Sequence, residues 1–333
     1  MKIYGIAFIK NGIKFDFPFR ESILSMVPLV DKIYVNVGIG DDGTLDAVRK
    51  IPKVEIIEVD WDDRRSDAGH ILSDMTNVAI KKMREEVQDE DAWAMYLQSD
   101  EVLHEDDLEL IQSDLEKAHH EGADVLRFRY MHFWQKNEHI AISKRWYPQE
   151  IRAFKVNTPI ISHGDAQTFE NWSKAYESDA HIWHYGHVRD EKAYRAKLDQ
   201  MSRYYQRGFT HYRKKLKAWM KDTFFGEKVV KFFGDHPEVM RERIRSQGGY
   251  PDGPAITSLH LKGDLSPYSP KLLKKINALR LITTESTNEP VTKSINLNKI
   301  KWKKSLSPIC RDWQPDFQMI IELSRHGIGF KKR

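Results

Sequence analysis

The amino-acid sequence predicts an α/β protein built on a mainly parallel β-sheet flanked by helices. Through about the first 130 residues, short apolar segments rich in β-forming residues alternate with segments whose apolar residues recur at helical spacing. Polar loops follow two of the apolar segments, where sheets of this kind bind ligands. Hydrophobic residues make up 40% of the chain and charged residues 31%, which is typical of a globular protein and not of a disordered one.

The first five predicted elements form a strand–helix–strand–helix–strand unit. Residues 3–9 and 32–37 are short apolar runs, and the segment between them contains a short helix over 20–27. A second helix is expected over 44–50, with Asp41 or Asp42 as its N-cap. Residues 54–59 (VEIIEV) form the third strand.

The next four elements continue the alternation. Apolar residues at helical spacing predict helices around 71–83 and 108–118. The runs AWAMYL (92–97) and DVLRFRY (124–130) predict the fourth and fifth strands. Helices between short apolar strands imply a sheet covered on both faces.

The remainder of the chain has a weaker pattern. Residues 131–185 mix Trp, Pro, Gly and His and are expected to form loops and short strands that complete an active site. Residues 189–248 read as helical and basic. We therefore expect three parts: an α/β catalytic domain, a basic helical C-terminal extension and a segment without a structural prediction, over 1–187, 188–255 and 256–333.

Several classes of protein are disfavoured by composition. A single cysteine, Cys310, excludes a disulfide framework or a cysteine-based zinc site within one chain. The N-terminus lacks the features of a signal peptide, and no run of 18 apolar residues is present, so we expect a cytoplasmic protein, with peripheral contact at the inner face of a membrane left open. The net charge of +4 is too small to argue for nucleic acid by itself.

Two loops carry the residues expected to bind ligands. Residues 38–44 (GIGDDGT) follow the second strand and open a helix, so free N–H groups and the helix dipole face a ligand there; a plain turn explains the same residues. Residues 98–101 (QSDE) follow the fourth strand, where carboxylates suit a hard divalent cation; a solvated acidic loop is the alternative.

Taken together, these motifs resemble the family 2 glycosyltransferases, which have a GT-A fold. The resemblance covers roughly residues 1–187 and is carried by AFIKNGIKF, GDDGTLDAV, TNVAIKK and AWAMYLQSDEVL. It implies a nucleotide-sugar donor, an Mn²⁺ or Mg²⁺ ion held by Asp100, and donor contacts from Asp42, Thr44, Asn77 and either Asp62 or Asp63.

The sequence departs from the family pattern at two positions. Gln98 stands where the first acid of the Asp-x-Asp motif is expected, and Asn36 with Val37 replaces the acid that commonly ends the second strand. Both amides can still hydrogen-bond a ribose or a base edge, so Asn36 and Gln98 are kept as donor-binding residues.

The remaining site residues come from the resemblance and from the chemistry of sugar transfer. The resemblance implies that His184, in HIWHYGHVRD with His181 and His187, joins the metal or diphosphate, where neutral imidazole is a common ligand; structural histidines are the alternative. Arg152 is expected at the diphosphate, whose geometry suits a guanidinium. An inverting transfer needs a carboxylate as base, and the candidates are Asp165, then Glu150 and Glu170.

Other functions compete with a transferase acting on a glycan, lipid or protein acceptor. A nucleotidyltransferase is disfavoured because FIKNGIKF lacks the glycine-rich loop expected after the first strand. A degenerate GT-A scaffold fits Gln98 and Val37. A nucleic-acid-binding protein could use the basic, aromatic stretch 203–231, although amphipathic helix packing explains the same residues.

Overall fold

The structure is a computed structural model. It describes residues 1–143, 145–205, 227, 229–232 and 236–248, and, nearer the C-terminus, the backbone of strands at 256–262, 280–283, 291–296 and 328–331. Most of the basic stretch 203–231 and most of 256–333 therefore lie outside the described residues.

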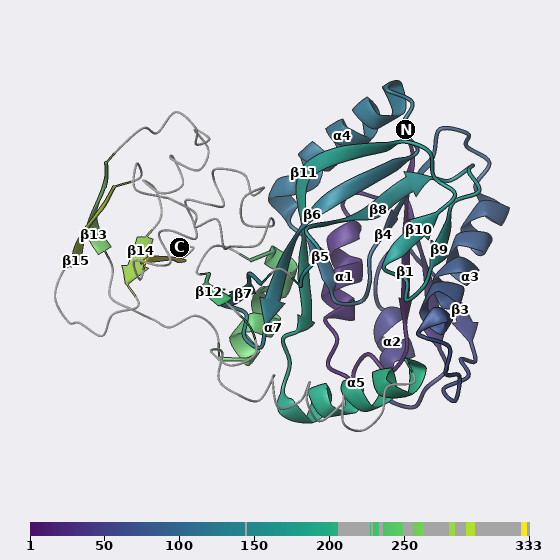
Figure 1. Cartoon of the computed structure of the whole chain (residues 1–333), viewed down its shortest axis with the longest axis horizontal. Helices are drawn as coiled ribbons and strands as arrows, with labels where there is room; N and C mark the ends of the chain where they lie inside the picture. The colour runs from purple at the N-terminus through teal and green to yellow at the C-terminus, as the bar shows by residue number, and fades with distance from the viewer. Residues whose placement is uncertain are drawn as a thin grey trace.

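Among the described residues, the central feature is a ten-stranded sheet in the order β12-β7-β6-β8-β4-β1-β2-β3, with β11 beside β6 and β5 beside β11 (Figure 1). Its strands are β1 (Ile3–Ile9), β2 (Lys32–Gly38), β3 (Val54–Val59), β4 (Trp93–Tyr96), β5 (Glu101–Leu103), β6 (Val125–Trp134), β7 (His139–Ala141), β8 (Gln149–Lys155), β11 (Ala175–His187) and β12 (Val229–Lys231).

The direction of the strands confirms the predicted fold class. Strands β3, β2, β1 and β4 run parallel, and so does the long pair β6 and β11. Strand β8 is antiparallel to both of its neighbours and joins the two parallel groups. The first, second and fourth predicted strands all end at one edge, because parallel neighbours share their direction.

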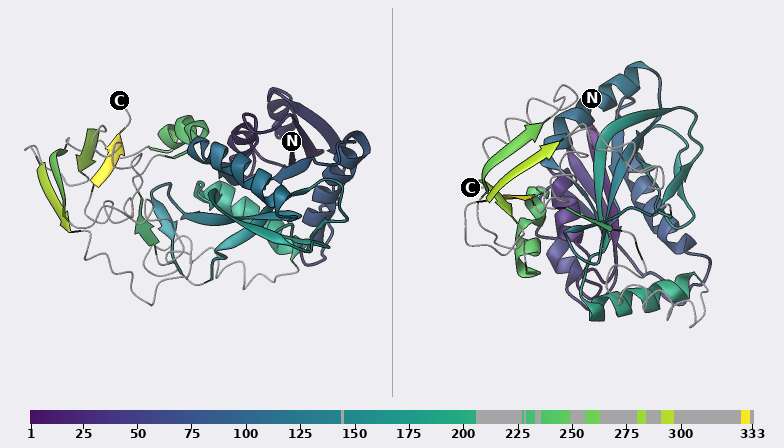
Figure 2. Two further views of the ribbon diagram at one scale, coloured as in Figure 1. Left: turned by 90° about the horizontal axis from the view of Figure 1, so that it is seen from above. Right: turned by 60° about the vertical axis from the view of Figure 1, so that its left-hand side comes forward.

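Helices cover both faces of this sheet, as Figures 1 and 2 show. Buried side chains of α1 and α4 belong to one apolar cluster, and those of α3 belong to a second cluster on the other face. The described helices are α1 (Phe19–Met26), α2 (Thr44–Val48), α3 (His70–Glu86), α4 (Leu108–His120), α5 (Glu191–Tyr204) and α7 (Arg241–Ser246), with short 3₁₀ helices at Glu105–Asp107 and Glu238–Met240.

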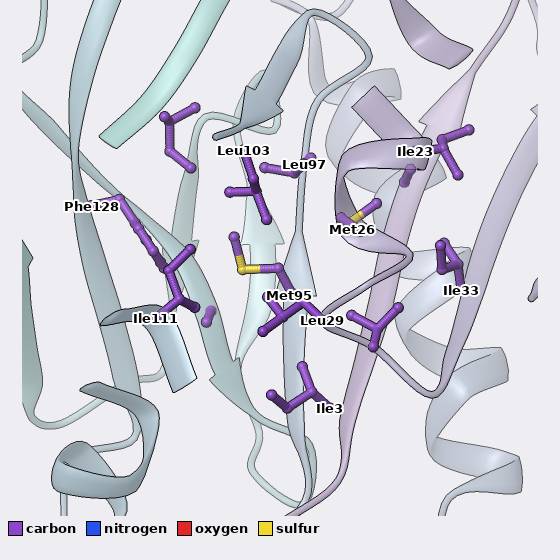
Figure 3. Packing of buried hydrophobic residues seen from close by; sticks show 14 of the residues in the cluster. Ile3, Ile23, Met26, Leu29, Ile33, Met95, Leu97, Leu103, Ile111 and Phe128 are labelled. Carbon is purple, nitrogen blue, oxygen red and sulfur yellow. The ribbon is translucent and has the colours of Figure 1, made fainter. Parts of the chain in front are cut away.

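The core beneath α1 and α4 fixes the edge of the sheet that carries the site. Met95 on β4 and Ile3 on β1 pack with Met26 of α1 and Ile111 of α4 (Figure 3). These side chains are at most 4% exposed. Burial of a side chain of this size contributes about 1.5–3 kcal/mol, so this core holds the ends of β1 and β4 in place.

Helix α5, drawn in teal in Figures 1 and 2, lies across the carboxyl ends of the parallel strands. Asp190 caps it, since the side-chain Oδ1 accepts a hydrogen bond from the amide of Ala193 at 2.7 Å. Tyr204 at its end accepts the amide hydrogen of Gly69 through its carbonyl at 3.0 Å. The helix expected in the 188–255 extension thus closes over the N-terminal sheet.

The region 131–185 differs from its prediction. It was expected to be loops and short strands, yet it contains the end of β6, the seven-residue β8 and the thirteen-residue β11. The reason is tertiary, because β11 obtains its partners from β6 and β5. Strand β7 and the hairpin of β9 (Ile161–His163) and β10 (Thr168–Glu170) match the expected short strands.

The C-terminal extension also differs from a purely helical prediction. Residues 229–231 form β12, which pairs antiparallel with β7 at the edge of the main sheet. Further along, β13 (Ile256–Lys262) pairs with β15 (Val291–Asn296), and β14 (Arg280–Thr283) pairs with β16 (Ile328–Lys331). The boundaries at 187/188 and 255/256 stay predictions.

Candidate functional site

A cavity of about 370 Å³ opens at the carboxyl ends of β1 and β4, beneath α5. Its walls come from the β1 end, the loop after β4, the end of β11 and the inner face of α5. The side chains that line it include Lys10, Trp61, Gln98, Asp100, Asp165, His184 and Lys197. The cavity therefore lies where open α/β sheets bind their ligands.

Asp100 lies in the loop after β4 and is 6% exposed. Its Oδ2 accepts a hydrogen bond from Lys197 Nζ at 3.2 Å, and its Oδ1 lies 3.8 Å from His184 Nε2. Burial raises the pKa of this carboxyl, but the positive charges of Lys197 and Arg189 and the hydrogen bond from Lys197 outweigh burial and lower the pKa to about 2. Asp100 is therefore a carboxylate at neutral pH.

His184 reaches the cavity from β11 and faces Asp100. Burial lowers the pKa of His184, and the nearby Asp100 only partly opposes this effect, so the ring is neutral at neutral pH. Gly186 leaves room for the pair: a Cβ at this position would meet the Nε2 of His184 and would lie 2.8 Å from Oδ2 of Asp100. A side chain at 186 would push the two groups apart.

Glu101 and Arg152 form a buried ion pair behind Asp100. Both side chains are 0% exposed, and Arg152 binds the carboxylate with Nε and Nη2 at 2.7 and 2.8 Å. Tyr130 donates its hydroxyl hydrogen to Glu101 at 2.8 Å, and the amide of Gln98 donates at 3.0 Å. Arg152 was expected at the diphosphate, but it does not line the cavity; its charge is used to hold the Asp100 loop.

Gln98 does line the cavity. Its side-chain Nε2 donates to the carbonyl of Ala166 at 3.0 Å, which links the loop after β4 to the loop that carries Asp165. The amide that replaces an acid in the family pattern thus joins two walls of the site.

The end of β1 supplies a second cationic group to the cavity. Lys10 Nζ donates to Asp63 Oδ2 at 2.7 Å and to the carbonyl of Trp61 at 3.2 Å. Tyr204 of α5 donates its hydroxyl hydrogen to the other oxygen of Asp63 at 2.9 Å. Of the two expected acids, Asp63 therefore holds Lys10, which lines the cavity. Asp62 is exposed and pairs with Arg64.

Asn36 is 0% exposed and lies below this wall. It donates to the carbonyl of Met75 at 2.9 Å and accepts a hydrogen bond from Trp61 Nε1 at 3.1 Å. Asn36 was expected to contact the donor, but it does not line the cavity. It orients Trp61 instead, whose ring does line the cavity.

Three other predicted donor residues hold loops together. Asp42 accepts hydrogen bonds from the amides of Lys14 and Thr44 at 2.9 and 3.1 Å, and Thr44 Oγ1 accepts one from Ile13 at 3.2 Å. Burial raises the pKa of Asp42, but these hydrogen bonds outweigh it and lower the pKa. Asn77 makes two hydrogen bonds to the backbone of β9, at 2.8 and 2.9 Å. None of Asp42, Thr44 and Asn77 lines the cavity.

The three candidate bases are separated by the structure. Asp165 lines the cavity, and its Oδ2 accepts a hydrogen bond from Tyr205 at 2.6 Å. Glu150 accepts a hydrogen bond from Gln167 at 2.6 Å, and burial raises its pKa, but it does not line the cavity. Glu170 is exposed and lies 3.2 Å from His163. Asp165 is the one of these three carboxylates that reaches the cavity.

The site contains residues that the sequence did not single out. Lys197 bonds Asp100 and the carbonyl of Gly186, and its Nζ lies 4.7 Å from the centre of the Phe17 ring. His132 on β6 is 0% exposed and contacts His184. Neither carries a local sequence signal: Lys197 is one of many basic residues of its region, and His132 follows a strand whose end was predicted two residues earlier.

The donor set is suited to a hard divalent cation that also binds a diphosphate. Within the described residues no three His, Cys, Asp or Glu side chains form a metal-binding group. Asp100 Oδ1 and His184 Nε2 are two donor atoms 3.8 Å apart, and these two side chains would hold the ion. Mg²⁺ and similar ions often take one or two protein ligands and complete their shell with phosphate oxygens and water.

Comparison with known proteins gives only distant likeness. No protein-family model matches the chain, and no curated protein matches it. Among solved structures, S. aureus TarS is 13% identical at a TM-score of 0.37, covering 61% of this chain and 39% of that one.

Two further solved structures show a similarly distant likeness. A mannosyltransferase from Pyrobaculum calidifontis, solved with GDP-Man and Mn²⁺, is 13% identical at a TM-score of 0.34, covering 74% of this chain and 68% of its own. A 4-diphosphocytidyl-2C-methyl-D-erythritol synthase is 10% identical at a TM-score of 0.34, covering 59% and 97%. Because these identities and TM-scores are low, the likenesses carry no argument about the function of this chain.

In the part of the chain that the structure describes, no helix is long and apolar enough to cross a bilayer.

Proposed function

We propose that the chain is a glycosyltransferase that transfers a sugar from a nucleotide-sugar donor to a glycan, lipid or protein acceptor, with inversion and with Mn²⁺ or Mg²⁺. The observation that carries the proposal is the convergence of Asp100, His184 and Lys197 in one cavity that Asp165 also lines. This arrangement provides two metal donors, one fixed cation and one carboxylate beside the same space.

The diphosphate would occupy the region of Asp100, Lys197 and Lys10. A bound divalent ion would act as a Lewis acid that neutralises the leaving diphosphate. Lys197 is already held there by Asp100 and Gly186, so its ammonium group adds a preorganised positive charge without reorganisation. The aromatic wall of Trp61 and Phe8, whose ring centroids are 5.8 Å apart, offers a stacking surface for the base.

Asp165 would act as the base. The acceptor hydroxyl oxygen forms a bond to the anomeric carbon while the bond from that carbon to the diphosphate oxygen breaks, and Asp165 takes the hydroxyl proton. The leaving diphosphate keeps the electron pair. The hydrogen bond from Tyr205 orients Asp165.

Nucleotide binding can be tested by thermal unfolding of the full chain with a panel of nucleoside diphosphates and nucleotide sugars, with and without Mn²⁺ or Mg²⁺. A ligand at a hundredfold its Kd stabilises by about 2.7 kcal/mol, which is a shift of several degrees. We expect a metal-dependent shift that Asp100→Asn abolishes and the exposed-site control Asp62→Asn retains. A flat panel for the wild-type chain would contradict the proposal.

Catalysis is tested separately by Asp165→Asn. We expect this variant to keep the metal-dependent thermal shift and to lose sugar transfer by a hundredfold or more, because general base catalysis contributes about 10²–10⁴-fold. The matched control is Glu170→Gln, an exposed carboxylate on the same hairpin region. Equal transfer by Asp165→Asn and the wild-type chain would remove Asp165 from the mechanism.

A binding protein without turnover is the second candidate. It is favoured by Gln98, which supplies no charge, and by Lys197, which already neutralises Asp100. This candidate predicts a metal-independent thermal shift with nucleotide and no release of nucleoside diphosphate from any donor in the panel.

A further inference from the structure

His132 lies directly behind His184 on the neighbouring strand. Strands β6 and β11 are parallel, and their register pairs His132 with His184. The two Nδ1 atoms are 2.9 Å apart. The cavity is lined by His184 but not by His132, so His132 acts on a ligand through its cavity-lining neighbours, and its ring-nitrogen contact among these is with His184.

The ring of His132 is fixed on both faces. It stacks on Tyr130 at a centroid distance of 5.2 Å and on Trp146 at 4.7 Å. Its Nε2 lies 2.9 Å from the backbone carbonyl oxygen of Tyr147. The ring therefore cannot turn without breaking a buried hydrogen bond and two aromatic contacts.

These contacts determine where the protons lie. The carbonyl oxygen of Tyr147 can only accept, so Nε2 of His132 carries a hydrogen. Both nitrogens of His132 face uncharged groups, and a fully buried imidazolium without a carboxylate partner is unfavourable, so the ring is neutral. Nδ1 of His132 is then a lone pair, and the hydrogen between the two rings belongs to Nδ1 of His184.

We propose that His132 is a positioning residue that holds His184 in the Nδ1-protonated tautomer and so points the His184 Nε2 lone pair at Asp100. In water, a histidine side chain favours the Nε2-protonated tautomer, which would place a hydrogen where a metal ligand needs a lone pair. The separation of 3.8 Å between Nε2 and Oδ1 of Asp100 is too long for a hydrogen bond, as expected for two acceptors. The tautomer itself does not depend on what the chain binds, but the binding of a metal ion to this lone pair rests on the proposed function.

The tautomer can be measured on the metal-free full chain. Long-range ¹H–¹⁵N correlation spectra of histidine-labelled protein distinguish protonated from unprotonated ring nitrogens, and the His184 signals are assigned by their loss in His184→Asn. We expect a protonated Nδ1 and an unprotonated Nε2. A protonated Nε2 on His184 would overturn the inference, whatever the chain binds.

Two variants separate positioning from packing. His132→Phe keeps an aromatic ring between Tyr130 and Trp146 and removes both hydrogen bonds, so we expect His184 to gain the Nε2-protonated form. His132→Gln carries an amide that can donate to Tyr147 and accept from His184, so we expect it to retain the wild-type tautomer. If His184 keeps a protonated Nδ1 in the His132→Phe chain, then His132 does not set the tautomer.

Metal affinity provides the second measurement. Free Mn²⁺ is followed by its electron paramagnetic resonance signal during titration of each chain in the presence of a nucleoside diphosphate. Loss of a hydrogen-bond partner of a metal-binding histidine typically costs 10–100-fold, so we expect that loss in His132→Phe and recovery in His132→Gln. The control is His181→Phe. It removes a fully buried histidine that lies on β11 and, like His132, does not line the cavity, so this variant should keep wild-type affinity.

The outcomes distinguish this inference from the proposed function. The predicted tautomer in a wild-type chain that binds no Mn²⁺ and no nucleotide would count against the transferase and support the positioning of His184. Wild-type Mn²⁺ affinity in His132→Phe, with nucleotide binding intact, would overturn the role of His132 and leave the transferase standing.

Discussion

Arg152→Met tests whether Arg152 supports the site or touches the donor. In the structure both Arg152 and Glu101 are 0% exposed, and two hydrogen bonds of 2.7 and 2.8 Å join them. The methionine fills similar volume but leaves the Glu101 carboxylate buried without its counter-charge. Tyr130 and the amide of Gln98 still donate hydrogen bonds to it, but neither supplies the positive charge that is lost.

The expected cost follows from this geometry. Removing one partner of a buried ion pair costs about 3–5 kcal/mol, because a charge is left without compensation. For a domain of about 200 residues, 1 kcal/mol lowers Tm by about 2–4 °C, so the fall should be roughly 6–20 °C. The double variant Glu101→Gln with Arg152→Met removes both charges and should recover much of the loss, since Gln keeps an acceptor for Tyr130.

Two assays are needed to read this result. Thermal unfolding gives the loss of stability, and calorimetry well below the lowered Tm gives the affinity for the nucleoside diphosphate that stabilises the wild-type chain. We expect the double variant to bind within a few fold of wild type. If Arg152 contacted the phosphate directly, any chain that lacks it would instead lose about 1.5–3 kcal/mol of binding free energy. Such a loss of affinity with little loss of stability would show that Arg152 binds the donor and does not support the Asp100 loop.

Two further predictions concern packing and charge. Gly186→Ala should weaken metal-dependent nucleotide binding at least tenfold with a small change in Tm, because its Cβ displaces His184 from Asp100; calorimetry with Mn²⁺ measures this. Glu86, the last residue of α3, accepts hydrogen bonds from Lys32, Lys82 and Tyr34, and these lower the pKa of its carboxyl to about 2. Its stabilising effect is present above the unfolded pKa of about 4.3 and is lost as pH falls towards 2, so Glu86→Gln should flatten the dependence of Tm on pH over that range, most clearly at low salt.

The fold of the first half could be predicted because its signals are local. Strands β1 and β3 have the predicted bounds, and the ends of β2 and β4 lie within one residue of prediction. Each is an apolar run between helices whose own spacing is clear. Burial on both faces requires such continuous apolar composition, and it can be read without knowledge of the partners.

Strand β11 could not be predicted in the same way. Its first half carries exposed Glu177 and Asp179, and its second half is a buried run of His, Trp and Tyr. Neither alternation nor a continuous aliphatic run is present. The segment becomes a strand because β6 and β5 lie on its two sides, which is information that a local pattern does not contain.

The candidate site shows the same division. The loop after β4 led to Asp100 and Gln98, and the structure brings both to one cavity with His184 and Asp165. By contrast, Arg152 and Asn36 have the residue types expected at a donor, but burial gives them supporting roles. Lys197 and His132 were not singled out, because their importance comes from the packing of α5 and β6 against distant parts of the chain.

The position of Mn²⁺ in crystals of the full chain grown with a nucleoside diphosphate tests the proposed metal site most directly. An anomalous difference map at the manganese absorption edge locates the ion without assumptions about the ligand. We expect one peak beside the Asp100 carboxylate and Nε2 of His184, next to the diphosphate and Lys197. A diphosphate bound in the cavity with no peak there, or a peak bound by other side chains, would contradict the proposed site.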